Sequence, residues 1–377
     1  MDVVRTSVAR GAPAVLAALH EASGLLADQP ISARPVWLSC WIQAFQDRFP
    51  LAVTLHRGGT VVGFACLALR RHGALTDVML AGDGPSDYGR LPATDAAIGR
   101  RLAEEVAAVV RAVHGPWRLR FDQLPVGDPV ARELARLLPR SSIGPAVPSP
   151  ILRIHPPRTL EAHAHRSLRR NVGRIRRRIE EAGISLETAT TMDPPSIRRL
   201  TPELEQVARR RDHAIGRRSP FDSRQWRTFY HLVLHTLAAA DVVAATTVRL
   251  GGQLAGYQIA LRDEDVWRIW DGRMNGEYAW CSPGSLVDVF FLEGALADPK
   301  VHEVDWQRGM QLQKLRASSD IREGEVLTAY SGAVVEAAHR VTRPIRRGLS
   351  AALPPSVKRA IREGLGAVSG PRSPSQH

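Results

Sequence analysis

The sequence predicts an α/β protein whose two halves repeat one order of elements. Its 377 residues are enough for two domains or one large one. Apolar runs on either side of Arg57–Thr60 predict a β-hairpin in the first half, and runs on either side of Gly251-Gly252 predict another in the second. After each hairpin the pattern predicts a third strand, a loop, a helix, a strand and a helix, so the halves form an architectural repeat without residue-level identity.

In the first half, apolar runs and helical periodicity separate strands from helices. A helix with loose flanks is expected within residues 1–30. The other expected elements are strands at Leu51–His56, Val61–Leu69 and Leu75–Leu80, a loop at Ala81–Arg90, a helix at Ala96–His114, a strand at Trp117–Phe121 and a helix at Pro129–Leu138.

The second half follows Ser141–Pro150, a stretch whose prolines and serines predict a connection. Ile151–Ile154 is expected as a strand that closes the first half. The elements expected after it are a basic helix at His163–Ala182, a strand at Ile184–Thr188, helices at Ser196–Arg211 and Ser223–Leu237, strands at Val242–Leu250, Gln253–Leu261 and Val266–Asp271, a helix at Ser285–Leu296, a strand at Glu303–Trp306 and a helix from about Met310. The predicted domains are residues 1–150 and 151–330, and residues 331–377 are expected to be a basic, partly disordered tail because prolines interrupt it.

Charge and composition narrow the class of protein. The formal net charge of +13 predicts attraction to a polyanion, such as a nucleotide cofactor, tRNA or an anionic surface. No run of about 20 apolar residues is free of charge, and the N-terminus has no apolar signal core, so a cytoplasmic protein without a membrane span is expected. Three cysteines are too few for a disulfide framework or a zinc cage. We interpret Cys281 as a small half-buried residue rather than as a nucleophile.

The turn from Trp280 to Leu286 is a candidate anion site. It reads Trp-Cys-Ser-Pro-Gly-Ser-Leu and opens a helix directly after a sheet. Helix starts carry free backbone N–H groups and a positive partial charge that can hold a pyrophosphate. Ser282 or Ser285 could add a hydroxyl. The alternative is an ordinary helix entry with Ser282 as its cap.

Two strand ends carry candidate catalytic and substrate-binding residues. The first is Trp270-Asp271-Gly272-Arg273, near Tyr278, where Asp271 could orient or deprotonate an amine. The second is Asp305-Trp306-Gln307-Arg308-Gly309, followed by Lys314. There Asp305 could be a base or an amine clamp, and Lys314 could neutralise a phosphate or a carboxylate. The alternatives are a turn-forming Asp-Gly and solvated surface ions.

The remaining patterns are a basic helix and several absences. Arginines 166, 170, 174 and 177 fall on one helical face, which is either a phosphate track for a cofactor or tRNA or a solvated surface. His231 and His235 lie one turn apart but lack a third ligand, so no metal is expected. The sequence has no Walker loop, no Gly-x-Gly-x-x-Gly and no Gly-x-Ser-x-Gly elbow.

In their order along the chain, these motifs resemble the CelD-like branch of the GNAT acyltransferase superfamily, which is related to the FemAB peptidyltransferases. The resemblance covers about residues 150–320, and the first half is similar more loosely, through its hairpin and the Asp87-Tyr88 loop. It implies two GNAT-like domains, each a mixed, mostly antiparallel sheet flanked by helices. The motifs that carry it are Arg169-Arg170-Asn171, Gly251-Gly252, Gly256-Tyr257, Trp270-Asp271-Gly272, Ser282-Pro283-Gly284 and Asp305-Trp306 with Gly309 and Lys314.

The resemblance implies acyl transfer. Ser282, Pro283 and Gly284 match the turn near the donor, while Asp305 and Lys314 match the acid and lysine of the last strand-helix unit. The Arg/Gln-x-x-Gly-x-Gly/Ala pyrophosphate loop usual in GNAT enzymes is absent, as is the aromatic residue often found beside that lysine.

Three functions stay open from the sequence. The first is transfer from an acyl-CoA co-substrate, acetyl-CoA first, to an amine on a small molecule, saccharide or peptide. The second is an aminoacyl-tRNA-dependent FemAB-like transfer, and the third is a non-catalytic GNAT-like binding protein. For the first, direct attack by an amine held near Asp271 or Asp305 is expected. On that basis Asp305→Ala should abolish turnover and leave folding intact.

Overall fold

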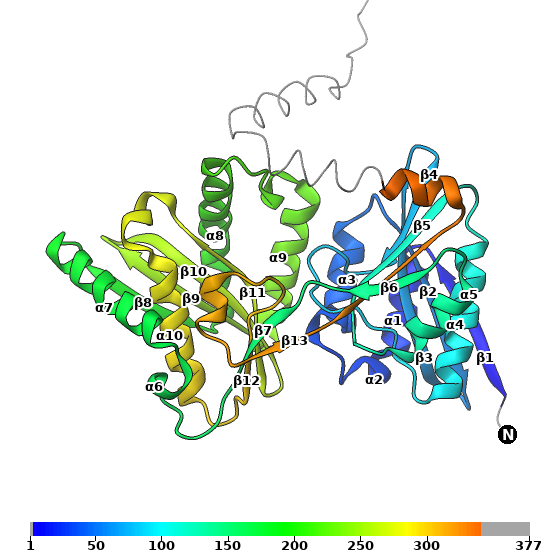
Figure 1. Cartoon of the computed structure of the whole chain (residues 1–377), viewed down its shortest axis with the longest axis horizontal. Helices are drawn as coiled ribbons and strands as arrows, with labels where there is room; N and C mark the ends of the chain where they lie inside the picture. Colours follow the sequence, from blue (N-terminus) through cyan, green and yellow to red (C-terminus); the bar gives the residue numbers. More distant parts are fainter. Residues whose placement is uncertain (1–2, 341–377) are drawn as a thin grey trace, which may run out of the picture.

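The computed structural model describes residues 3–340 as two seven-stranded sheets that lie next to one another along the long axis (Figure 1). The predicted α/β class is confirmed. Both sheets are mixed and mostly antiparallel, with one parallel pair each, β4 with β5 and β11 with β12. The strands of the first sheet are, in order across it, β1 (Val4–Arg10), β2 (Phe49–Arg57), β3 (Thr60–His72), β4 (Leu75–Leu80), β5 (Trp117–Leu124), β14 (Glu325–Tyr330) and β6 (Ser142–Pro145).

The second sheet follows the same plan. Its strands are, in order, β13 (Asp320–Arg322), β7 (Ser149–Arg153), β12 (Glu303–Asp305), β11 (Val266–Met274), β10 (Gln253–Asp263), β9 (Val243–Leu250) and β8 (Leu186–Thr191). Both predicted hairpins form. Their two-residue turns, Gly58-Gly59 and Gly251-Gly252, have positive φ at both positions, which glycine adopts without strain.

Helices cover the sheets on both faces. In the first half they are α1 (Ala12–Glu21), α2 (Ser23–Leu26), α3 (Pro35–Ala44), α4 (Ala96–Arg111) and α5 (Pro129–Leu137). In the second half they are α6 (Leu160–His163), α7 (Arg166–Glu181), α8 (Pro194–Ala214), α9 (Arg224–Ala239), α10 (Pro283–Ala297) and α11 (Leu312–Leu315). Helices α7 and α10 share one core with the second sheet, while α8 and α9 share another core with its opposite face.

The two halves exchange a strand near their ends. β7 follows the first half in sequence but pairs with β12 and β13 in the second sheet. β14 comes near the end of the described chain but lies between β5 and β6 in the first sheet. The prediction that Ile151–Ile154 closes the first half is therefore wrong, because these residues supply backbone hydrogen bonds to β12. The chain thus crosses between the halves at both places (Figure 1).

One apolar core spans both halves. Trp37 on α3 contacts Phe229 on α9 and Trp270 on β11, with ring centres 5.2 Å apart in both pairs and edge-to-face geometry. Phe45, at the end of α3, also packs on Phe229. Because these rings come from different halves, the burial of apolar area holds the halves in one arrangement.

The sequence misassigned elements near both ends of the described chain. Val4–Arg10 is an edge strand rather than part of a helix, and α3 was not predicted. The helix expected from Met310 is the four-residue α11, followed by β13 and β14, whose pairing partners lie about 170–200 residues earlier in the sequence. Most of the predicted basic tail, residues 341–377, lies outside the described residues.

Candidate active site

The second sheet opens between its two parallel strands. β11 and β12 pair only over Val266–Arg268 and Glu303–Asp305, after which β12 ends and β11 continues to Met274. Trp270 is an extra residue on β11 opposite β10, a β-bulge that bends the strand at this point. Beyond Arg268, β11 therefore has no ladder partner on its β12 side, and an extended ligand could use its backbone groups.

Helix α10 begins at this opening, and its first turn lacks a side-chain cap. Ser282 has left-handed backbone angles, φ 48° and ψ 57°, and its hydroxyl does not bond the first-turn amides. Pro283 occupies the first helical position, where a missing N–H is tolerated. Gly256 on β10 allows the close approach of α10, since a Cβ there would lie 3.1 Å from Val287. The uncapped start carries the positive end of the helix dipole.

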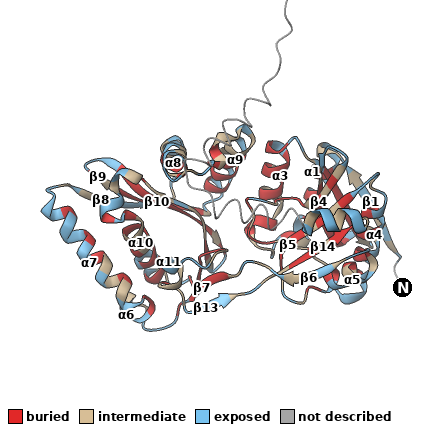
Figure 2. Ribbon diagram, turned by 45° about the horizontal axis from the view of Figure 1, so that its top comes forward, coloured by how far each residue is buried: buried red, intermediate tan, exposed pale blue. Residues whose placement is uncertain are grey.

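The basic helix α7 packs beside the start of α10. Asn171 donates a hydrogen bond from Nδ2 to Ser285 Oγ at 3.2 Å, and Arg178 donates one to the carbonyl oxygen of Trp280, also at 3.2 Å. The apolar face of α7 is buried and its arginine face is exposed (Figure 2). Positive charge therefore flanks the uncapped turn.

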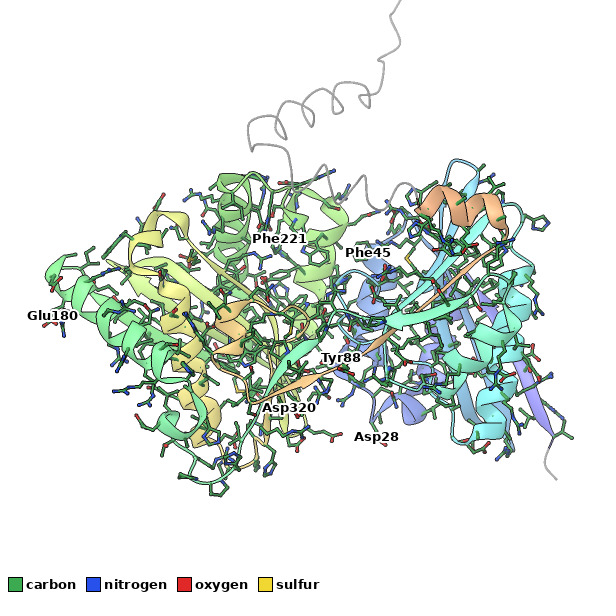
Figure 3. All side chains as sticks on the ribbon, in the orientation of Figure 1. Asp28, Phe45, Tyr88, Glu180, Phe221 and Asp320 are labelled. Carbon is green, nitrogen blue, oxygen red and sulfur yellow. The ribbon has the colours of Figure 1, made fainter. Side chains whose placement is uncertain are left out.

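Asp305 lies at the centre of a buried ion cluster between the halves. One carboxylate oxygen, Oδ2, accepts hydrogen bonds from the Tyr88 hydroxyl, from Arg268 at 2.7 Å and from Arg322 at 2.8 Å. The other, Oδ1, accepts the backbone N–H of Gln307 at 2.8 Å. The side chain is fully buried. Tyr88 comes from the first half and lies at the junction near β13 (Figure 3).

The cluster continues through the arginines that contact Asp305. Arg268 also donates to Asp263 at 2.7 Å, and Asp263 in turn accepts from Arg34 of the first half. Arg322 on β13 pairs with Glu303 at 2.7 Å. Every charge in this cluster has a partner of opposite sign, as burial requires.

Lys314 lies just past the end of β12. Its ammonium group donates to the carbonyl oxygens of Gln307 and Arg308, at 3.2 and 2.9 Å. Burial lowers its pKa, and the carboxylates of Asp87, Asp305 and Asp288 counteract that shift. Carboxylates from the loop at residues 81–94, from β12 and from α10 therefore all act electrostatically on this lysine.

Asp87 reaches this region from the first half. Its carboxylate pairs with Arg308, and the Gln307 amide, with its nitrogen turned toward β11, donates to Asp87 and, at 3.2 Å, to the carbonyl oxygen of Ile269. Burial raises the pKa of Asp87 to about 6, although Arg308 and Lys314 oppose the shift. Gln307 thus spans the mouth of the strand opening.

Asp271 lies on the face of β11 that carries α8 and α9. It accepts hydrogen bonds from the hydroxyls of Tyr230 at 3.1 Å and Tyr257 at 2.8 Å, and it pairs with Arg273 at 3.1 Å. Trp270 stacks on Tyr230, with ring centres 5.0 Å apart.

Comparison with known proteins identifies the second half. Residues 166–312 match the family model of the acetyltransferase (GNAT) domain, and this range contains α7, the strand opening and α10. Residues 166–312 form a GNAT acetyltransferase domain. The predicted GNAT superfamily membership and N-acyltransferase class are thereby confirmed. No curated protein matches the sequence.

Solved structures share the double fold. FemX is 10% identical, with 86% of this chain and 98% of that chain covered, at a TM-score of 0.58. The C-terminal domain of a candidate lysylphosphatidylglycerol synthetase from Agrobacterium fabrum is 10% identical, with coverage of 85% and 94% and a TM-score of 0.54. A tandem GNAT protein from the clavulanic acid biosynthesis pathway is 17% identical, with coverage of 87% and 99% and a TM-score of 0.50. These likenesses show that the chain has two GNAT-like units.

In the first GNAT-like unit, the helix start that corresponds to the start of α10 is capped, and a loop covers the corresponding end of the sheet. Its helix α4, which follows β4 as α10 follows β11, is capped by Asp95, whose carboxylate accepts the N–H of Ile98 at 2.8 Å. Its loop at residues 81–94 bonds along the end of β5, where Gly89 donates to the Gln123 carbonyl oxygen. A Cβ at Gly89 would lie 2.4 Å from the Asp122 carbonyl oxygen, so only glycine permits this contact. The loop therefore closes the first unit and carries Tyr88 to the second.

The structure separates the site residues predicted from the sequence. Ser282, Pro283, Gly284 and Ser285 lie with Tyr278 on the α10 side of the GNAT domain. Trp270, Asp271 and Arg273 lie on the α8–α9 side. Asp305 and Lys314 lie at the end of β12 between these groups. Tyr278 donates to the carbonyl oxygen of Leu250, which makes it a support of the turn.

Several residues of the GNAT site were not predicted. Asp288, Gln258 and Gln307 carry polar groups around the opening, and Asp288 had a visible signal, because it is the only charge in the apolar run Leu286–Leu292. Cys281 is buried, and burial raises the pKa of its thiol, which does not suit a nucleophile. Within residues 3–340, no three His, Cys, Asp or Glu side chains group as metal ligands. No helix in that range has the length and apolar content of a membrane span.

Proposed function

We propose that this enzyme transfers an acyl group from acyl-CoA to a primary amine. The observation that carries the proposal is the contrast between two equivalent helix starts. Asp95 places a carboxylate on the first turn of α4, whereas α10 leaves its first turn open beside α7. A helix start without a side-chain cap, next to arginines, suits the pyrophosphate of a nucleotide donor.

The strand opening suits the rest of the donor. The thioester arm would lie along β11 beyond Arg268, where the strand lacks a ladder partner on its β12 side. A backbone N–H near the Trp270 bulge would then polarise the acyl carbonyl. This donor agrees with the cytoplasmic location expected from the sequence.

Asp271 and Asp305 take different roles in this proposal. Asp271 faces the α8–α9 side with Arg273 and Trp270, and we assign it to orientation of the acceptor. Asp305 already accepts hydrogen bonds from Tyr88, Arg268 and Arg322, so we assign it to positioning of the domain junction.

Gly284→Asp tests the donor site. A Cβ added at residue 284 would meet no atom within 4 Å, so the variant should fold normally. Its carboxylate would occupy the first turn of α10, as Asp95 does in α4, and would repel the pyrophosphate. We expect the Kd for acetyl-CoA, measured by calorimetry, to rise at least about tenfold, which corresponds to about 1.4 kcal/mol. Gly284→Ala is the control and should bind as the wild type; equal binding by both variants would exclude this donor site.

The exposed arginines of α7 favour one second candidate, an aminoacyl-tRNA-dependent transfer. Arg166, Arg170, Arg174 and Arg177 are all exposed on the helix that flanks the opening. Such a stripe can follow a phosphate backbone.

A double variant, Arg170→Glu with Arg174→Glu, distinguishes aminoacyl-tRNA from acyl-CoA as the donor. If tRNA is the donor, the double variant should lose tRNA binding by more than about tenfold, and binding by the wild type should fall steeply with salt. If acyl-CoA is the donor, wild-type protein should bind acetyl-CoA and show only weak, salt-sensitive tRNA binding. Filter binding at several salt concentrations and calorimetry with acetyl-CoA distinguish these results.

A further inference from the structure

Helix α10 carries one carboxylate that its packing does not explain. Asp288 is the only charged residue in the run Leu286–Leu292, whose other members pack into the core of the GNAT domain. It is half-buried, and among the described residues no donor lies within hydrogen-bonding distance of its carboxylate. A charge that is partly removed from water without a hydrogen bond destabilises the folded state. A half-buried carboxylate without a hydrogen-bond partner in the described chain is a candidate for function.

The position of Asp288 connects it with the rest of the site. It lies one helical turn after Gly284, at the start of α10 where we place the donor. Lys314, which is bonded to the carbonyl oxygens just past β12, acts electrostatically on both Asp288 and Asp87. Asp288 therefore lies within electrostatic reach of Lys314, which is bonded just past the end of β12.

Gln258 is a second polar group on this side without a partner. It is 3% exposed, and its side-chain nitrogen is buried without a hydrogen bond. It follows Gly256 by two residues on β10, so it points toward the α10 layer, as the site of a Cβ at Gly256 does. Gly272 on β11 lies opposite Gln258 and adds no side chain above the sheet. The buried nitrogen of Gln258 and the half-buried carboxylate of Asp288 thus both lack a hydrogen-bond partner in the described chain on the α10 side of the sheet.

We propose that Asp288 is the general base that removes the proton from the attacking amine. The inference rests on the proposed acyl-CoA-dependent function and names the residue that handles the proton. Asp305 and Asp271 are less suited, since their oxygens already accept from arginines and tyrosines, whereas the Asp288 oxygens are free to accept.

The step balances without a further reactant. The Asp288 carboxylate takes one proton from the ammonium form of the acceptor, and the neutral nitrogen attacks the thioester carbonyl. The C–N bond forms and the C–S bond breaks. The second proton leaves the nitrogen for the CoA thiolate, and Asp288 releases its proton to water.

The ionisation of Asp288 suits this role. Burial raises its pKa to about 7, and Lys314 opposes that shift. Lys314 is the charged group that acts on it within the described chain; on the packed side of α7, Asn171 bonds Ser285 and Arg176 lies over Phe290. A base with a pKa near 7 is both ionised and able to hold a proton at neutral pH.

Asp288→Asn tests the assignment in the full-length enzyme. Acetyl-CoA is mixed with a panel of primary amines (glucosamine, lysine and putrescine), and release of the CoA thiol is followed from pH 5 to 9. For the best amine we expect kcat to fall about 10²–10⁴-fold, with the Kd for acetyl-CoA unchanged. The wild-type rate should rise through pH 7, and the variant should lose that rise. Glu293→Gln removes an exposed carboxylate from the same helix and should behave as the wild type.

Melting temperatures give a readout independent of turnover. Because the pKa of Asp288 is higher in the folded than in the unfolded protein, its ionisation destabilises the fold as the pH rises from about 4 to 7. Asp288→Asn should therefore melt at or above the wild-type temperature at pH 8. If Asp288→Asn melts below the wild type at pH 8, or if its kcat stays within about threefold of the wild-type kcat, Asp288 is not the base. Either result leaves the proposed acyl-CoA donor standing. If the wild type neither binds acetyl-CoA nor acylates any amine, the donor proposal falls, and Asp288 as its base falls with it.

Discussion

Asp305→Asn is expected to lower the free energy of unfolding by about 3 kcal/mol, the cost of leaving buried charges incompletely paired. Asparagine has nearly the same shape, so no cavity forms. Its amide nitrogen, however, would face either the donors Tyr88, Arg268 and Arg322 or the N–H of Gln307. Facing the first group, the amide meets two arginines, and only the Tyr88 hydroxyl can turn to accept from it. Facing the second, it meets the N–H of Gln307, so at least one buried N–H group loses its acceptor in either orientation.

Urea unfolding monitored by tryptophan fluorescence checks this expectation. Asp320→Asn is the matched control, since Asp320 pairs with Arg153 on the surface, with side chains 49% and 62% exposed. An exposed pair of this kind contributes less than about 1 kcal/mol, so the control should unfold as the wild type does. If Asp305→Asn keeps full stability and loses all turnover, Asp305 is the catalytic acid or base expected from the sequence, and the positioning role is wrong.

Leu327→Ala is expected to destabilise the first half of the protein by about 2–5 kcal/mol, although the residue lies near the end of the described chain. Leu327 is fully buried on β14, where it pairs with Phe121 on β5 and Ile143 on β6. Truncation leaves a cavity in the core formed with α4 and α5.

Hydrogen exchange locates the effect. We expect faster exchange in β5 and β6, because β14 is the strand between them, with a smaller change in β9 and β10. Ile321→Ala, on the neighbouring strand β13, is the control, since that side chain is 44% exposed. Destabilisation confined to the second sheet would contradict the strand exchange. The same exchange implies that a protein cut near residue 150 would lack β14 in its first sheet.

The fold was largely predictable because its signals are local. The glycine pairs at 58–59 and 251–252 specify both hairpins, and helical periodicity specifies α4 and α7. β13 and β14 could not be found in this way, because short strands gain their stability from partners far away in the sequence. Val4–Arg10, which lies in the range expected to hold a helix with loose flanks, was not recognised as a strand for the same reason: its exposed edge position against β2 leaves only a weak pattern.

The candidate site was predictable only as a set of positions. The start of α10 was visible as Ser282-Pro283-Gly284, and the family match supports its context. The role of Asp305 was not visible, because its arginine and tyrosine partners come from β11, β13 and the loop at residues 81–94. Asp288 was not predicted. Its only signal is that it is an isolated charge in an apolar helix, and its meaning depends on whether a partner is nearby.

The sequence by itself therefore determined the class of fold, the two hairpins and the location of the uncapped helix start, since each depends on residues close together in the chain. Only the tertiary structure decided which carboxylates are already occupied and which are free, and which half each strand completes. The physical reason is that burial and pairing are set by distant residues. The aspartate at position 305 is a structural ion beside two arginines, whereas the aspartate at position 288 has no hydrogen-bond partner within the described chain.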